Sequence, residues 1–232
     1  MSLYLILNIV AISVPLLYSF EREMYFIKWW KEAVASILIV GAFFIVWDIV
    51  FTNLGVWGFN EAYITGVYLV GLPIEEWLFF LCIPYASIFV HYAFSHYFPN
   101  IRLGVKTTNS ITSLLIIGST LIALFNTDKL YTFYNFALLA LLLLFCLITK
   151  NKQLARFYIS FVIILIPFFV VNGILTGSFI ENEVVWYNNA ENLRIRIGTI
   201  PVEDIGYAFS MLFSSILLIE FFKSKSDEKN KN

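Results

Sequence analysis

The chain has 232 residues, of which 60% are hydrophobic and only 13% are charged, and its formal net charge is −1. Soluble domains carry roughly 25% charged residues, so this composition excludes an ordinary soluble protein and indicates one that lies mostly within a membrane. Two cysteines, Cys82 and Cys146, lie inside apolar runs and offer neither a disulfide framework nor metal-ligand spacing. We expect no metal, no cofactor and no nucleic-acid partner.

Seven apolar runs predict an all-α integral membrane protein with seven transmembrane helices. The first run has no basic residues before it and no small-residue cleavage site after it, which favours a retained helix over a signal peptide. The seven spans are expected at about 3–19, 33–52, 73–97, 110–126, 130–148, 157–176 and 200–222.

The positive charges divide unevenly between the two ends of these spans. Only three of the fifteen Lys and Arg residues, Lys129, Arg194 and Arg196, fall on the side of the N-terminus. The positive-inside rule therefore predicts an N-terminus outside and a C-terminus in the cytoplasm, for a multi-pass protein of the inner (cytoplasmic) membrane. The last segment, 223–232, is polar and is expected to be a disordered cytoplasmic tail.

The third and seventh spans open with the same motif. Residues 73–79 read Pro-Ile-Glu-Glu-Trp-Leu-Phe, and residues 201–207 read Pro-Val-Glu-Asp-Ile-Gly-Tyr. Each motif has a proline, an aliphatic residue, two adjacent acids and an aromatic residue at the same offset. The chain thus places two acid pairs at matching positions.

Two explanations of these acid pairs remain open. Proline suits the first turn of a helix and carboxylates there interact favourably with the helix dipole, so the motifs could serve only as helix caps, with Arg194 and Arg196 as ion-pair partners. Acids in membrane segments are costly, however, and are usually functional. The candidate catalytic residues are therefore Glu75, Glu76, Glu203 and Asp204.

The similarity extends beyond the motifs, because segments 43–50 and 168–175 share a Phe-Phe pair followed by aliphatic residues. We interpret the first three and the last three spans as two copies of one three-helix unit. The intervening span restores the direction of the chain, so the copies are expected to be parallel and to place both motifs at the same side. The predicted organisation is a first repeat at 1–97, a linking helix at 98–129, a second repeat at 130–222 and the tail at 223–232.

Two acid pairs that face each other cannot all ionise cheaply, so they would share protons and supply a donor and a base in one dry pocket. Positions i and i+4 of a helix lie on one face, which places Phe79 beside Glu75 and Tyr207 beside Glu203. An aromatic ring next to an acid can stabilise a carbocation. Glu75 and Glu203 are therefore the leading candidates for proton transfer, with Glu76 and Asp204 assisting.

Further residues are expected to line the same pocket. Asp48 in the second span and Asn172 in the sixth could point inward, although an interhelical polar contact would explain Asp48 equally well. The aromatic loops 53–72 and 177–199 are either interfacial belts or lids. The candidate substrate-binding residues are Asp48, Trp77, Phe79, Asn172 and Tyr207.

Two three-helix units with a Pro-x-Glu-Glu/Asp motif at the third helix of each, at 73–76 and 201–204, resemble the membrane lycopene β-cyclases of the heterodimeric type. In that family two small subunits or one fused chain form the enzyme, and this chain is similar to the fused form. Asp204 stands where the first motif has Glu76.

The resemblance implies an isomerase of the intramolecular lyase type. It would cyclise the ψ ends of lycopene by acid catalysis, without redox chemistry, to give γ-carotene and then β-carotene. The substrate would be lycopene or a related acyclic carotenoid from the bilayer, and the implied partners are membrane lipids and other carotenoid enzymes. The chain has no Gly-x-Gly-x-x-Gly fingerprint for a dinucleotide.

Other membrane proteins fit less well. A retinal protein needs a lysine in the middle of a span, and no span has one. A polyprenyl transferase needs Asp-rich metal motifs, which the sequence lacks. A proton-coupled transporter built on parallel repeats stays open, although Pro84 and Pro167 are isolated and do not form the Gly/Pro pairs of a broken helix.

Overall fold

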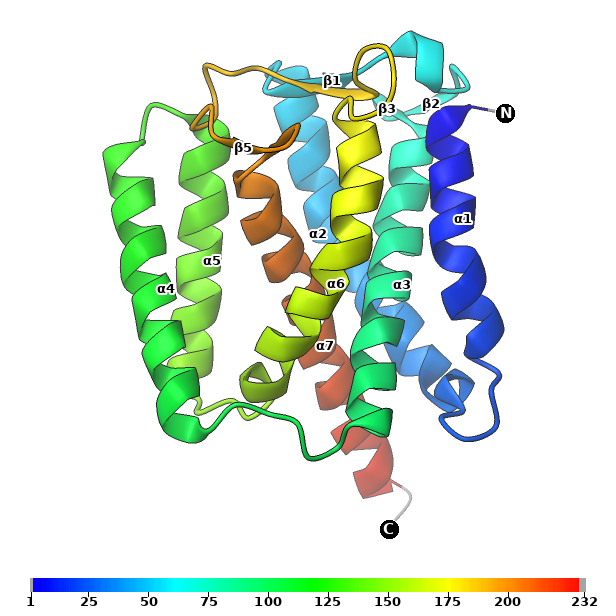
Figure 1. Ribbon diagram of the computed structural model, residues 1–232, viewed down its shortest axis with the longest axis vertical. Coiled ribbons are helices and arrows are strands. Elements are labelled where there is room, and N and C mark those ends of the chain that lie inside the picture. The colour runs from blue at the N-terminus through cyan, green and yellow to red at the C-terminus, as the bar shows by residue number, and fades with distance from the viewer. Residues whose placement is uncertain (1, 230–232) are drawn as a thin grey trace.

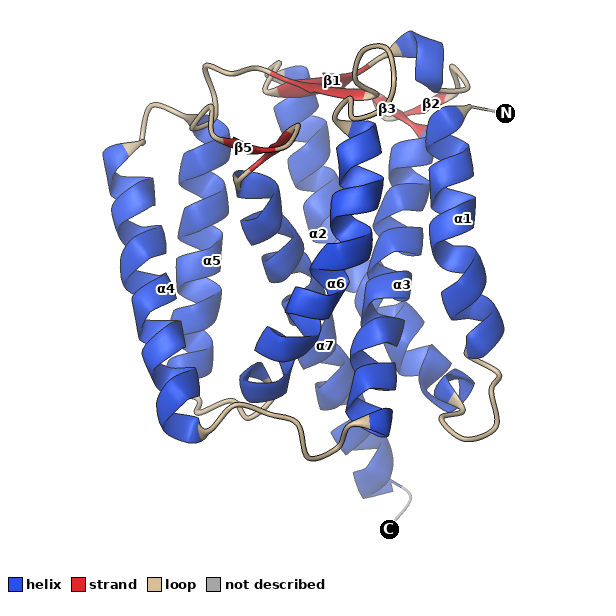
Figure 2. Ribbon diagram, viewed as in Figure 1, coloured by secondary structure: helices blue, strands red, loops and turns tan. Residues whose placement is uncertain are grey.

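The computed structural model describes residues 2–229, which form an upright bundle of seven α-helices with the N-terminus at one end and the C-terminus at the other (Figure 1). Three small two-stranded antiparallel sheets cover the end near the N-terminus (Figure 2). The helices are α1 (Leu3–Tyr18), α2 (Trp30–Asn53), α3 (Ile74–Tyr97), α4 (Val105–Phe125), α5 (Leu130–Ile148), α6 (Leu154–Leu175) and α7 (Glu203–Lys229). The strands are β1 (Trp57–Phe59), β2 (Tyr68–Leu69), β3 (Leu72–Pro73), β4 (Val185–Tyr187), β5 (Arg196–Ile197) and β6 (Ile200–Pro201), and two short 3₁₀ helices are η1 (Phe26–Trp29) and η2 (Glu61–Tyr63).

Six of the described helices, α2 to α7, are long and apolar enough to cross a membrane. The first predicted span also forms an apolar helix, but α1 has only 16 residues. At 1.5 Å per residue it measures about 24 Å, less than the roughly 30 Å of a bilayer's hydrocarbon core. The all-α prediction is confirmed, and the described helices support a multi-pass membrane protein.

The acid helices α3 and α7 are central to the packing. Helix α1 packs against α3 and α5 packs against α7, while α2 contacts both α3 and α7 and α6 contacts α3. Helix α4 packs mainly on α5 at the outside of the bundle (Figure 1). Both α3 and α7 begin at the end of the bundle where the strands lie (Figure 1), which is the arrangement expected for parallel copies.

Lipid tails are as apolar as the side chains, so packing and interhelical hydrogen bonds hold such a bundle together, the latter at about 0.6 kcal/mol each on average. The contacts include Ser19 Oγ with Tyr85 Oη at 2.6 Å and Thr112 Oγ1 with Tyr158 Oη at 2.8 Å. His91 is buried and shares a hydrogen bond of 2.7 Å with Ser160.

The C-terminal segment differs from its predicted disorder. Helix α7 continues through Lys229, so most of segment 223–232 extends the last helix past its apolar part. Residues 230–232 lie outside the described part of the chain.

Corresponding loops of the two halves are built alike. Strands β2 and β3 form a hairpin that leads into α3, and β5 and β6 form a hairpin that leads into α7. Positive φ values at Val70 and Gly71 in the first turn and at Gly198 in the second suit such two-residue turns. Strand β1 from one loop pairs with β4 from the other, which joins the two halves across the end of the bundle.

Candidate active site

Each acid pair occupies the first turn of its helix because a proline ends the hairpin before it. Pro73 has φ −62° and ψ 146° as the N-cap of α3, and Pro201 ends β6 two residues before Glu203 opens α7. The acids thus lie where the free N–H groups and the helix dipole favour negative charge. Capping explains the position of the pairs but leaves open what their side chains do.

The first acid of the first pair is held by the surrounding loops. Glu75 is fully buried, and its Oε1 accepts hydrogen bonds of 2.7 Å from Ser2 Oγ and from the backbone N–H of Thr65. The side-chain amide of Asn8 donates to the backbone carbonyl of Glu75 at 2.8 Å. Glu75 therefore fixes the loop and the start of α1 to the acid helix.

The second half repeats this arrangement. Glu203 is fully buried, and its Oε1 accepts hydrogen bonds of 2.7 Å from Thr132 Oγ1 and from the backbone N–H of Leu193. The amide of Asn135 donates to the carbonyl of Glu203 at 2.5 Å. The Oε2 atoms of Glu75 and Glu203 have no hydrogen-bond partner among the described residues.

The second acid of each pair accepts a hydrogen bond from a tyrosine hydroxyl on the first helix of its own half. Tyr4 donates to Glu76 Oε2, and Tyr131 donates to Asp204 Oδ1 at 2.5 Å. These tyrosines stand four residues before Asn8 and Asn135, so a Tyr-x-x-x-Asn spacing occurs in both halves. We call each such set of contacts between a first helix and its acid pair a clamp.

Asp204 accepts two further hydrogen bonds. Tyr187 Oη donates to its Oδ2 at 3.1 Å, and the amide of Asn172 lies 3.5 Å from the same oxygen. Burial, reinforced by the charge of Asp204, raises the pKa of Tyr187 in strand β4 well above its ordinary value. Its hydroxyl therefore stays protonated and remains a donor to this carboxylate.

Asp48 of α2 completes a group of three carboxyls. Its Oδ1 accepts hydrogen bonds from Trp57 Nε1 and, at 3.4 Å, from Thr52 Oγ1. Its carboxyl also interacts with that of Glu76, and both groups are buried. Two adjacent buried carboxyls share a proton more easily than they carry two charges.

Asp48, Glu76 and Asp204 all line one cavity of about 290 Å³ whose walls are otherwise mainly apolar. The lining follows one face of each acid helix at intervals of three and four residues. On α3 it comprises Glu76, Phe79, Phe80, Ile83, Ala86, Ser87 and Val90, and on α7 it comprises Asp204, Tyr207, Ala208, Met211 and Leu212. From Glu76 to Val90 the cavity extends along about 21 Å of helix.

Four of the five predicted substrate-binding residues line this cavity, namely Asp48, Phe79, Asn172 and Tyr207. Trp77 is not among the residues that line it, and its indole N–H donates instead to the carbonyl of Leu69 at 3.0 Å.

Of the four predicted catalytic acids, Glu76 and Asp204 line the cavity, whereas Glu75 and Glu203 face the loops. Sequence reasoning missed Tyr4 and Tyr131, although the repeated Tyr-x-x-x-Asn spacing is a signal that could have found them.

The arginines suggested as partners of the second acid pair bind elsewhere. Arg194 donates to the carbonyl of Asn189 at 2.9 Å, and Arg196 donates to the carbonyl of Thr199 at 2.6 Å. Neither forms an ion pair with Glu203 or Asp204 among the described side chains, so hydroxyl, amide and backbone donors serve these acids instead.

Replacing Trp57 by Phe is expected to destabilise the fold by about 1–3 kcal/mol, since the buried Asp48 carboxyl loses its indole donor. Trp47→Phe is a matched control, because the indole N–H of Trp47 is buried without a partner among the described residues. Denaturant unfolding of both purified variants measures the difference. Equal losses of stability would show that ring size, and not the bond to Asp48, is responsible.

A family model described as lycopene cyclase matches residues 1–94 and 128–222, two segments that each contain one clamp and one acid pair. No curated protein and no solved structure matches the chain.

Proposed function

The chain belongs to the lycopene cyclase family, and from this premise we propose that it is a lycopene β-cyclase, an isomerase that closes β-rings at the ψ ends of lycopene. The observation that carries the proposal is the group of three buried carboxyls, Asp48, Glu76 and Asp204, around one largely apolar cavity. Such a site can give a proton to an alkene and take one back without a redox cofactor.

The proton donor in this proposal is the pair formed by Asp48 and Glu76. Because the two carboxyls are buried and interact with each other, one proton shared between them leaves a neutral acid next to an anion. Transfer of that proton to the terminal alkene of the substrate produces a tertiary carbocation. The role of proton donor thus goes to Glu76 and not to Glu75, whose side chain is hydrogen-bonded to the loop.

Ring closure then moves the positive charge onto the new ring. The internal alkene attacks the cation, one carbon–carbon bond forms, and the charge passes to a ring carbon. Phe79 and Tyr207 line the cavity next to the acids, and aromatic faces stabilise cations by about 0.5–2 kcal/mol each. The apolar walls also keep water from capturing the cation.

Asp204 is the proposed acceptor of the departing proton. It receives hydrogen bonds from Tyr131, Tyr187 and Asn172, which stabilise its carboxylate form. A carbocation is so acidic that even a weakly basic carboxylate can remove the adjacent proton. Loss of that proton leaves the ring double bond, and the product has the same atoms as the substrate.

The size of the cavity favours one end group at a time. Its volume of about 290 Å³ lies at the lower limit of small-molecule sites, roughly 300–1,000 Å³. We expect one ψ end group beside the acids and the polyene along α3 toward the bilayer. Cyclisation of both ends would then require release and reversal of the intermediate γ-carotene.

We further propose that the N-terminus and the acid end of the bundle face the outside of the inner membrane, because most positive charges lie at the opposite end. Lycopene would enter from the lipid phase, and contact with other carotenoid enzymes would shorten its path. The repeat at 1–97, the linking helix at 98–129 and the repeat at 130–222 form the proposed organisation.

Expression in a bacterial host that accumulates lycopene tests the activity. We expect γ-carotene and β-carotene by pigment chromatography, and membranes without added nicotinamide or flavin cofactors should give the same products. Rings formed in deuterated water should contain deuterium from the protonation step. Unchanged lycopene despite abundant protein in the membrane would contradict the proposal and favour the transporter alternative.

A further inference from the structure

A second pocket, of about 280 Å³, is lined by residues from the end of α3, the start of α6 and the end of α7. These helix ends lie at the opposite end of the bundle from the starts of α3 and α7 (Figure 1). Residues of η1 also line the pocket. The side chains that matter here are Lys28, Trp29, Tyr92, Arg156, Glu220 and Lys223. The reaction proposed above uses none of them, so the pocket requires a separate explanation.

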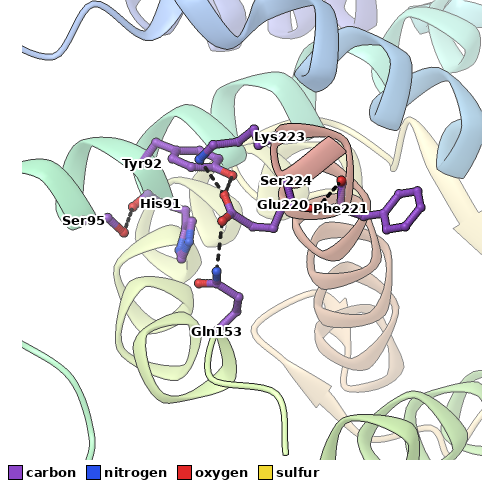
Figure 3. A network of polar contacts seen from close by, with 8 residues as sticks. All are labelled: His91, Tyr92, Ser95, Gln153, Glu220, Phe221, Lys223 and Ser224. Carbon is purple, nitrogen blue, oxygen red and sulfur yellow. Dashed lines mark hydrogen bonds and ion pairs between the residues drawn. The ribbon is translucent and has the colours of Figure 1, made fainter. Parts of the chain in front are cut away.

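The carboxylate of Glu220, the acid in this pocket, already has partners within the chain. Glu220 accepts hydrogen bonds from Tyr92 Oη at 2.5 Å and from Gln153 Nε2 at 3.0 Å, and it forms an ion pair of 2.7 Å with Lys223 (Figure 3). The ammonium of Lys223 also lies 4.6 Å from the centre of the Trp29 ring. Glu220 and Lys223 therefore neutralise each other.

Two positive charges remain uncompensated. Arg156 donates from Nη2 to the carbonyl of Pro99 at 2.6 Å, but its Nε is buried and has no partner among the described residues. The ammonium of Lys28 lies 5.6 Å from the Trp29 ring, and no carboxylate lies within ion-pair distance of either cation among the described side chains. A buried guanidinium N–H without an acceptor is costly unless a ligand supplies one.

We propose that this pocket binds the phosphate group of an anionic phospholipid through Arg156 and Lys28. Arginine binds phosphate through paired N–H donors, and lysine adds a second charge. The pocket lies at the ends of membrane-spanning helices, where lipid phosphates are found, and the half-buried ring of Trp29 lines it. The proposal does not depend on the cyclase reaction.

Native mass spectrometry of the purified 232-residue chain in detergent, with short-chain phosphatidylglycerol as the probe, tests the proposal. We expect phosphatidylglycerol to bind to the chain about tenfold more tightly than phosphatidylcholine does. One interfacial cation contributes about a fivefold change in affinity, so Lys28→Gln and Arg156→Gln should each weaken binding about fivefold. Arg156→Lys should restore only part of the loss, because lysine keeps the charge but lacks the paired N–H donors of arginine.

Lys106→Gln is the matched control, since Lys106 is an exposed cation near the start of α4, at the same end of the bundle but outside the pocket. The affinity of this variant for phosphatidylglycerol should stay within about twofold of that of the unaltered chain. If Lys106→Gln weakens binding as much as Lys28→Gln does, the attraction is that of a general surface charge and the proposal is wrong. If inorganic phosphate or glycerol 1-phosphate binds as tightly as the lipid, the ligand is a soluble phosphate and the assignment to lipid is overturned.

Discussion

Replacing Glu76 by Gln is expected to slow the cyclisation of lycopene by ~10²–10⁴-fold, the usual cost of losing a positioned acid. The amide keeps the size of the side chain and can still accept the hydrogen bond from Tyr4, so the protein should insert and accumulate normally. What it lacks is the proton that we propose Glu76 shares with Asp48. The measurement is product formed per amount of protein in membranes supplied with lycopene.

Glu75→Gln is the matched control, because Glu75 is the neighbouring residue on the same helix and does not line the cavity. Its amide oxygen can still accept the hydrogen bonds from Ser2 and Thr65, so activity should remain within about tenfold of the unaltered chain. An inactive but normally folded Glu75→Gln variant, beside an active Glu76→Gln variant, would return the donor role to Glu75.

Replacing Asp204 by Asn should abolish ring formation to a similar extent, ~10²-fold or more, but at a later step. The proposed donor, the pair of Asp48 and Glu76, is unchanged in this variant, so the substrate can still be protonated. The resulting cation lacks its base and returns a proton to the carboxylate that supplied it. In deuterated water, recovered lycopene should therefore contain deuterium although no ring has formed.

This isotope result separates the two acids. Glu76→Gln should give neither rings nor deuterium in the recovered lycopene, whereas Asp204→Asn should give deuterium without rings. Glu203→Gln is the control for the second motif and should leave both readouts near normal, since Glu203 contacts Thr132 and a loop. Recovered lycopene free of deuterium in the Asp204→Asn variant would place Asp204 in the protonation step.

The sequence was sufficient for the helical fold and for the position of the acid pairs. Motifs at 73–79 and 201–207 combine proline, acids and an apolar run, and each of these residues has a local physical reason to begin a membrane helix. Both pairs lie at the same end of the bundle (Figure 1), as the repeat interpretation expects. Local rules are reliable here because helix starts depend on neighbours in the chain.

Which acid of each pair faces the cavity could not be predicted in the same way. Phe79 lies four residues after Glu75 and three after Glu76, and both spacings place side chains on one helix face. The surrounding residues are apolar on every side, so the sequence does not show how the helix is rotated. Contacts between residues that are distant in the chain, such as Tyr4 with Glu76 and Tyr131 with Asp204, determine this rotation.

Each clamp joins helices of one half, whereas the cavity takes its walls from both halves and strand β1 pairs with β4 across them. A gene split within the connection at 98–104 would leave each product with its own acid pair in place and neither with an enclosed reaction space. The strand pair would then be a contact between two proteins. Cells with such a split gene would have to match the synthesis of both products, and the scarcer one would set the carotenoid output.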